Sequence, residues 1–179
     1  MGTNWRSKAF HDVWYKNLKD AGFADRIAWI RAAAASRPRM DLSRIGCYGS
    51  SVGGQNAAAA VIHHRDFYKV AVALSGCHDN RLDTLQWSEV RMGYPVDVSY
   101  EASSKVTHAE KLGGLLMLVA GELDTNVDPA STLRLADALI KADKEFDLVF
   151  VPGGTHYVDE VPLVQKKRDV FFKRHPSTR

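Results

Sequence analysis

Short apolar runs alternate along the chain with longer segments of helical periodicity. The runs Lys69–Leu74 and Leu115–Ala120 are almost continuously apolar, which is typical of strands that helices cover on both faces of a parallel sheet. Two further strands are predicted at Arg44–Tyr48 and Phe146–Val151, each followed by a glycine-containing turn. Because longer helical segments separate these strands, the chain predicts βαβ units and an α/β fold with a mostly parallel sheet.

Helices are predicted between and around these strands. Apolar residues at helical spacing favour a helix over Asp25–Ser36, and an amphipathic pattern predicts a last helix over Glu160–Arg174. Asp128 and Pro129 are typical of a helix start. Four residues are expected to form the apolar face of that helix: Leu133, Ala136, Leu139 and Ile140. The stretch His78–Leu112 is irregular, so we expect short helices and loop there, at the carboxyl ends of strands where binding sites commonly form.

The length and composition exclude several classes of protein. At 179 residues the chain has the size of one domain, and we predict a single domain over residues 1–179. Lys and Arg number 24 and Asp and Glu number 21, so the charge balance lacks the basic concentration of a nucleic-acid protein and we expect no such partner. No apolar stretch is long enough to span a bilayer, and the N-terminus has no secretory pattern. We therefore expect no membrane association and, by default, a cytoplasmic location.

A catalytic motif lies at the predicted turn from the first strand to a glycine-rich helix. Residues 49–53 read Gly-Ser-Ser-Val-Gly and match Gly-x-Ser-x-Gly, a pattern that places a serine on a tight strand-to-helix turn. We expect side chains at Gly49 and Gly53 to collide with the neighbouring backbone, while the serine is pushed into solvent. Ser51 is therefore the candidate nucleophile, and Ser50 occupies a variable position of the motif.

A serine nucleophile needs a histidine to accept its proton and a carboxylate to orient that histidine. In folds with this motif the acid follows the penultimate strand and the histidine follows the last one. Asp124 comes directly after the predicted strand that ends at Ala120, and His156 comes after the one that ends at Val151. Ser51, Asp124 and His156 are therefore the predicted triad.

Other reactive groups are weaker candidates. Glu122 and Asp128 remain alternative acids, although Asp128 is also expected to cap a helix. Residues 77–79 read Cys-His-Asp, but sequence neighbours cannot point their side chains into one chain of hydrogen bonds, which disfavours a thiol mechanism. Nothing in the sequence says whether Cys47 and Cys77 pair. No phosphate-binding glycine motif and no His/Cys metal spacing occurs, so we expect no metal and no cofactor.

A set of motifs spread over nearly the whole chain recurs in one known family. They are Ala9–Val13, Asp41–Gly46, Gly49–Gly54, Ser88–Glu89 with Met92–Gly93, Asp124–Val127 and His156. In these segments the chain resembles the catalytic domain of the prolyl oligopeptidase family, closest to its dipeptidyl peptidase IV branch. The resemblance implies an α/β-hydrolase-type three-layer sandwich, and it makes Ser51, Asp124 and His156 the nucleophile, the acid and the base.

The resemblance also implies a substrate site. The backbone N–H of Val52 becomes one oxyanion donor, and Asn126 holds a substrate carbonyl. Val127 and Trp87 line a pocket for a proline-like or small apolar residue. Two positions depart from the family: Val52 replaces the aromatic residue usual there, and Tyr157 stands where glycine is frequent.

The chain also differs from the family in its architecture. Its first residues already match the interior of the catalytic domain, so the early strands, the β-propeller and a loop with a tyrosine oxyanion donor have no counterpart. We therefore expect a fragment of a larger family architecture, without implied dipeptide-releasing specificity. The strand Arg44–Tyr48 would then have an unpaired edge. We expect a homo-oligomer, formed through this edge or by exchange of the N-terminal segment Thr3–Lys19.

Together these features predict a serine hydrolase that cleaves peptide bonds through an acyl-enzyme on Ser51. A carboxylesterase acting on short esters is one alternative, because activated esters tolerate a poorer oxyanion hole than amides do. A catalytically silent domain that retains the triad by descent is another. The expected partner is accordingly a peptide or a small ester substrate.

Overall fold

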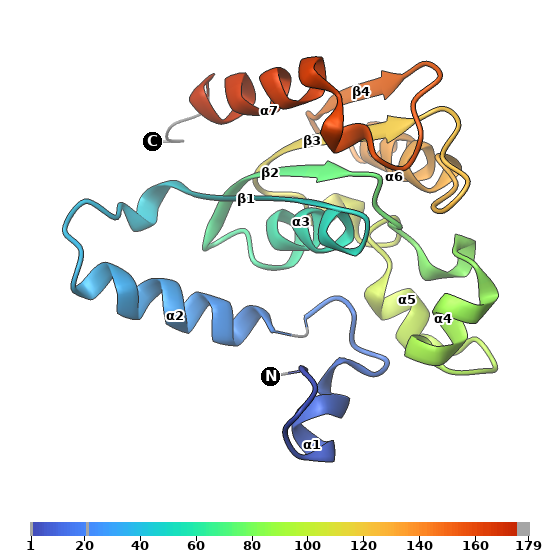
Figure 1. Ribbon diagram of the computed structural model, residues 1–179, viewed down its shortest axis with the longest axis horizontal. Coiled ribbons are helices and arrows are strands. Elements are labelled where there is room, and N and C mark those ends of the chain that lie inside the picture. The colour runs from blue at the N-terminus through green and yellow to red at the C-terminus, as the bar shows by residue number, and fades with distance from the viewer. Residues whose placement is uncertain (1, 21, 175–179) are drawn as a thin grey trace.

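The computed structural model describes residues 2–20 and 22–174 and has an α/β fold (Figure 1). In the described residues the sheet has four strands, in the spatial order β1 (Ile45–Ser50), β2 (Tyr68–Leu74), β3 (Leu115–Gly121) and β4 (Asp147–Val151). All three neighbouring pairs run parallel. The predicted parallel sheet is confirmed, and each predicted strand ends within two residues of its observed bounds.

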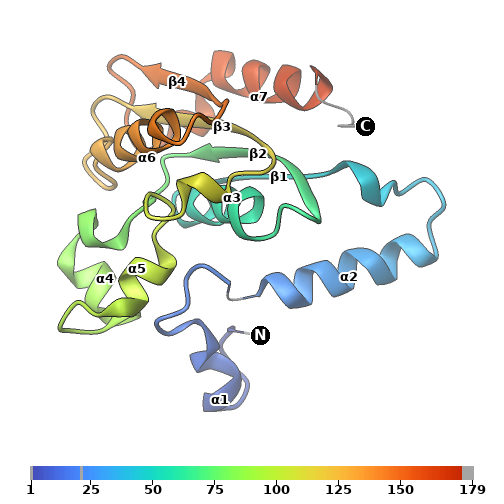
Figure 2. The ribbon, with the colours of Figure 1, turned by 180° about the vertical axis from the view of Figure 1, so that it is seen from behind.

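Helices connect the strands and cover both faces of the sheet. The longer ones are α2 (Phe23–Ala35), α3 (Val52–His63), α6 (Ala130–Lys141) and α7 (Pro162–Arg174). On one face, Ala71 and Leu116 pack in a core with residues of α2, α3 and α6. On the other face, Val72 and Met117 pack with Val164 and Phe171 of α7. Because successive strand residues point to opposite faces and both faces are covered, β2 and β3 are apolar almost throughout. Figures 1 and 2 show the resulting three layers.

The orientation of α6 differs in part from the one predicted, since Ala136 and Leu139 are buried as expected. Asp128 Oδ1 accepts the backbone N–H of Ala130 at 2.8 Å, so this carboxylate caps the helix start as expected. Leu133 and Ile140 are exposed, however, and cannot belong to the buried face. The buried residues of α6 are Ser131, Thr132, Leu135, Ala136 and Leu139. Only one face of a helix can pack against the sheet, and in α6 the small polar residues Ser131 and Thr132 occupy part of that face.

The segment between β2 and β3 contains two short helices, α4 (Leu85–Met92) and α5 (Val98–Ser103), with short 3₁₀ turns around them. This agrees with the short helices and loop expected from the sequence. The N-terminal segment with α1 (Lys8–His11) is attached to these helices: the Lys16 N–H donates to the carbonyl of Arg91 at 2.9 Å. Within the described ranges, no helix is both long enough and apolar enough to cross a membrane.

Candidate active site

Ser51 lies on the sharp turn between β1 and α3. Its backbone has φ 59° and ψ −124°, a combination that side-chain-bearing residues rarely adopt and that marks a strained turn. The turn is anchored to the sheet, because the Ser51 N–H donates to the carbonyl of Leu74 in β2 at 2.9 Å. The predicted strand-turn-helix around the serine is therefore present, with Val52 as the first residue of α3.

Two glycines allow this turn to pack so closely. A Cβ atom at Gly49 would lie 2.5 Å from the carbonyl carbon of Gly53, and a Cβ atom at Gly54 would lie 2.4 Å from the carbonyl oxygen of Leu74. The collision that the sequence predicts for a side chain at Gly53 is wrong, because a Cβ atom there would meet nothing within 4 Å. The predicted collision therefore holds for Gly49 alone. Because Gly49 has no side chain, the backbone of Gly53 can pack against it.

Asp124 and His156 form a hydrogen-bonded pair. His156 Nδ1 lies 2.8 Å from Asp124 Oδ2, and the two side chains are 13% and 2% exposed. The other oxygen of the carboxylate, Oδ1, accepts the backbone N–H groups of Asn126 and Val127, both at 2.9 Å. The carboxylate is therefore held by backbone donors on one side and is bound to the imidazole on the other, as a residue that orients a histidine requires.

The loops that carry this pair are tied to each other. They follow the adjacent strands β3 and β4, whose carboxyl ends meet at the same edge of the sheet. The Leu123 N–H donates to the carbonyl of Gly154 at 2.7 Å, and the Gly153 N–H donates to Glu122 Oε2 at 2.8 Å. A Cβ atom at Gly121 would lie 2.4 Å from the carbonyl oxygen of Thr155, so only glycine permits this approach.

The two alternative acids are engaged elsewhere. Glu122 binds the backbone of Gly153, and Asp128 caps α6 through Ala130. Of the three acids considered in the sequence, Asp124 is the one whose carboxylate contacts His156.

A small cavity of about 100 Å³ brings together most of the predicted site residues. Five of them line it: Ser51, Val52, Trp87, Asn126 and Val127. His156 is not among the lining residues; it is connected to the cavity through Asp124, which binds the backbone of Asn126 and Val127. The structure thus brings five of the seven predicted residues to one cavity and pairs the other two, Asp124 and His156, with each other.

Sequence reasoning missed four further residues of this cavity. They are Gln55, Cys77, Asp83 and Thr84. Gln55 lies one helical turn after Ser51, so its position on the same face of α3 was the one signal that the sequence offered. The other three come from the irregular segment after β2, whose path no periodicity predicts. Their polar side chains make the cavity less apolar than the resemblance suggests.

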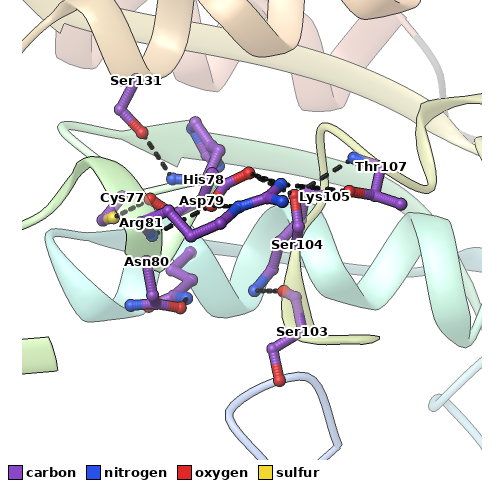
Figure 3. Close-up of polar contacts among 11 residues, drawn as sticks. Cys77, His78, Asp79, Asn80, Arg81, Ser103, Ser104, Lys105, Thr107 and Ser131 are labelled. Carbon is purple, nitrogen blue, oxygen red and sulfur yellow. Dashed lines mark hydrogen bonds and ion pairs between the residues drawn. The ribbon is translucent and has the colours of Figure 1, made fainter. Parts of the chain in front are cut away.

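The run Cys77, His78 and Asp79 forms no thiol triad (Figure 3). The Cys77 thiol donates to the backbone carbonyl of Asp79 at 3.2 Å, and burial raises the pKa of Cys77 to about 12, so the thiolate is disfavoured. Neither ring nitrogen of the buried His78 has a hydrogen-bond partner among the described residues. Asp79 pairs with Arg81 instead. Cys47 and Cys77 are both free thiols.

Comparison with known proteins places these features in a family. The sequence model of the prolyl oligopeptidase family matches residues 1–176 of this chain. Dipeptidyl peptidase 8 of Mus musculus and of Homo sapiens are each 27% identical to this chain over 162 residues, which cover 88% of this chain and 18% of theirs. Venom dipeptidyl peptidase 4 of Vespula vulgaris is 27% identical over 160 residues, or 86% of this chain and 20% of that protein. The chain thus spans about a fifth of the length of these relatives.

Solved structures show the same fold. Dipeptidyl peptidase 4 of Porphyromonas gingivalis superposes with a TM-score of 0.81 at 26% identity, over 91% of this chain and 24% of that one. A Bacteroides ovatus protein, assigned only provisionally as a dipeptidyl aminopeptidase IV, superposes with a TM-score of 0.85 at 24% identity, over 93% of this chain and 24% of that one. The fold is that of the catalytic α/β-hydrolase domains of such proteins, and the chain belongs to the prolyl oligopeptidase family.

Proposed function

We propose that this protein is a serine hydrolase that cleaves peptide bonds through an acyl-enzyme on Ser51. The observation that carries the proposal is the 2.8 Å hydrogen bond between His156 and Asp124, on a loop whose next residues line the same cavity as Ser51. Family membership and the names of the relatives, which are dipeptidyl peptidases, support a peptide as the substrate.

In the proposed reaction, His156 accepts the proton of the Ser51 hydroxyl while the serine oxygen attacks the carbonyl carbon of the scissile bond. Asp124 binds Nδ1 of the imidazole, which leaves Nε2 to take the proton and stabilises the imidazolium. His156 then protonates the leaving amine. A water molecule, activated by the same histidine, hydrolyses the ester on Ser51 and regenerates the enzyme.

Negative charge on the substrate oxygen needs hydrogen-bond donors in the transition state. We assign one to the backbone N–H of Val52. This group belongs to the first turn of α3, where N–H groups have no partner within the helix and the helix dipole is positive. We assign Asn126 to a substrate carbonyl, and Trp87 and Val127 to the walls of the substrate pocket. All three line the Ser51 cavity.

The first test is labelling with a fluorophosphonate, which modifies a serine that a working base has activated. Intact-mass spectrometry should find one adduct on the wild type and none on Ser51→Ala. Ser50→Ala is the matched control, because Ser50 precedes the nucleophile and its hydroxyl donates to Asp159, and it should still form the adduct. A wild type that stays unlabelled would overturn the proposal.

A second measurement separates peptide from ester hydrolysis. The protein should release the chromophore from blocked peptide anilides as well as from short nitrophenyl esters. Cleavage of the esters alone would contradict the peptidase assignment and leave an esterase.

A further inference from the structure

One carboxylate lines the cavity of the proposed nucleophile, and others line the cavity next to it. Asp83 lines the Ser51 cavity and also lines a larger cavity of about 500 Å³ beside it. Thr84 and Asn126 are shared between the two cavities as well, so the two spaces are contiguous along these residues. Three further carboxylates line the larger cavity: Glu122, Asp124 and Asp128.

Of these four carboxylates, Asp124 is paired with His156, whereas Asp83, Glu122 and Asp128 form no salt bridge within the described residues. Among residues 2–20 and 22–174, no Lys, Arg or His lines either cavity, although the chain as a whole has a net charge of +3. Asp83 Oδ1 accepts the Thr84 backbone N–H at 2.8 Å, which leaves part of the carboxylate's capacity to accept hydrogen bonds unused. The positive charge that acts on Asp83 is that of Arg91, whose guanidinium is placed over the Trp87 ring, 4.2 Å from its centroid.

An independent observation in the Ser51 cavity also indicates a missing donor. Gln55 lines this cavity and is only 1% exposed. Its Nε2 donates to Asn80 Oδ1 at 2.7 Å, but its Oε1 has no hydrogen-bond partner among the described residues. A buried amide oxygen without a partner costs free energy unless a ligand or water supplies a donor. The cavity therefore offers a neutral acceptor at Gln55 and a charged one at Asp83.

We propose that this cavity binds the basic side chain, lysine or arginine, of the substrate residue whose carbonyl Ser51 attacks. The inference rests on the proposed hydrolase function and names its substrate class. The walls formed by Val52, Trp87 and Val127 would contact the methylene groups of the side chain, and its N–H groups would reach Asp83 and Gln55. An ammonium or guanidinium group fits because it brings several N–H donors together with a positive charge.

A substrate with a neutral or acidic side chain fits less well. A small apolar residue would leave both acceptors without a donor, and a carboxylate would be repelled by Asp83. Burial also raises the pKa of Asp83, because a carboxylate that is partly withdrawn from water is less stable in its charged form.

Binding is tested first without turnover, on the inactive variant Ser51→Ala. Isothermal titration calorimetry compares two blocked peptides that differ only in one residue, lysine in one and norleucine in the other. Norleucine has the same number of side-chain carbons and no charge, so the difference reports the cation alone. We expect the lysine peptide to bind at least about tenfold more tightly, and equal affinities would overturn the inference.

Substitutions test which residues cause the difference in affinity between the lysine and norleucine peptides. In the Ser51→Ala background, Asp83→Asn should bring the lysine-to-norleucine ratio close to one, and Gln55→Met should lower it by a smaller factor. Asp66→Asn is the matched control, because it removes the same charge from an exposed turn before β2, and it should preserve the ratio. A ratio unchanged by Asp83→Asn would contradict the assignment of the cation to Asp83.

Turnover by the wild type separates this inference from the proposed function. A kcat/KM that is at least about tenfold higher for a lysine anilide than for its norleucine analogue supports both. Equal kcat/KM values would leave the hydrolase standing and overturn the basic specificity. Selective binding without any turnover or fluorophosphonate adduct would support the cation site and overturn the hydrolase.

Discussion

Lys105 is a charged residue in the interior of the protein. Its side chain is fully buried, and its Nζ donates to the backbone carbonyl of Ser103 at 2.8 Å (Figure 3). No carboxylate of the described residues lies within ion-pair distance of it. Burial lowers the pKa of Lys105 to about 8 from its usual 10.5, because the low-dielectric interior disfavours the ammonium form.

Lys105→Met should therefore stabilise the protein, by roughly 1–3 kcal/mol at pH 7. The folded state releases the proton of Lys105 near pH 8 while the unfolded state keeps it until about 10.5, so wild-type stability rises over this window as the buried charge is lost. The gain from the substitution should accordingly shrink between pH 8 and pH 10.5.

Urea unfolding at pH 7 and pH 10 measures the difference between the two proteins. Lys166→Met, on the exposed face of α7, serves as the control and should change the free energy of unfolding by less than about 0.5 kcal/mol at both values. A gain that is equal at pH 7 and pH 10 would show that packing rather than charge is responsible.

Asp124→Asn tests the acid at the same scale. An amide can accept the Asn126 and Val127 N–H groups as the carboxylate does, but it cannot stabilise an imidazolium or fix the tautomer of His156. We expect kcat to fall by about 10³ to 10⁴ with little change in the unfolding midpoint. Asp137→Asn, which removes an exposed carboxylate from α6, is the control for charge, and a loss of less than tenfold for Asp124→Asn would argue against its role.

At the level of elements, the contact between α3 and β2 depends on one glycine of the Gly53-Gly54 pair. Gly54→Ala should destabilise the protein by about 1–3 kcal/mol or more, because its Cβ would overlap the carbonyl oxygen of Leu74. Gly53→Ala should be neutral or stabilising by up to about 1 kcal/mol, because the space is open and alanine favours a helix. Thermal unfolding of the two variants provides the comparison, and similar midpoints would contradict it.

The strands could be predicted from the sequence to within two residues. The strands β2 and β3 are buried almost throughout and leave continuous apolar runs, whereas the more exposed β1 and β4 are marked by short apolar runs that end at a glycine-containing turn. The helix face of α6 could be predicted only in part: Ala136 and Leu139 are buried as expected. Leu133 and Ile140 have the right chemistry but lie outside the buried stripe, and hydrophobic periodicity alone does not weigh the small residues Ser131 and Thr132 that pack there. The local sequence pattern therefore predicts that a helix or strand forms more reliably than it predicts which of its faces is buried.

For the candidate site, the sequence identified residues that lie on turns directly after strands. Ser51, Asp124 and His156 belong to this group, since the end of a strand determines where such a side chain emerges. Asp83 and Gln55 were not predicted, because their place in the cavity depends on how the segment after β2 folds against α3. That packing involves contacts between distant parts of the chain, which no short motif encodes.

At the scale of the whole molecule, β1 is an edge strand of the sheet in the described residues. An unpaired edge offers backbone groups to another chain, so we propose that the protein forms a homo-oligomer, through this edge or by exchange of the segment Thr3–Lys19.

Light scattering during size-exclusion chromatography measures this directly. At micromolar concentration the mass should be a multiple of the 19.9 kDa chain mass. Tyr48→Lys places a charge on β1, where Tyr48 is exposed, and should lower the mass toward the monomer, while Tyr157→Lys, exposed on the loop after β4, should not. A monomeric wild type would refute the proposal.

The order of the site along the chain has a consequence for biosynthesis. The turn of the proposed nucleophile follows β1, whereas the proposed acid and base follow β3 and β4. A chain emerging from the ribosome therefore exposes Ser51 long before His156 exists to activate it. During translation the serine is chemically ordinary, and hydrolytic competence would arise only when the last strand of the sheet docks. Such timing would protect the translation machinery and neighbouring nascent chains from premature cleavage.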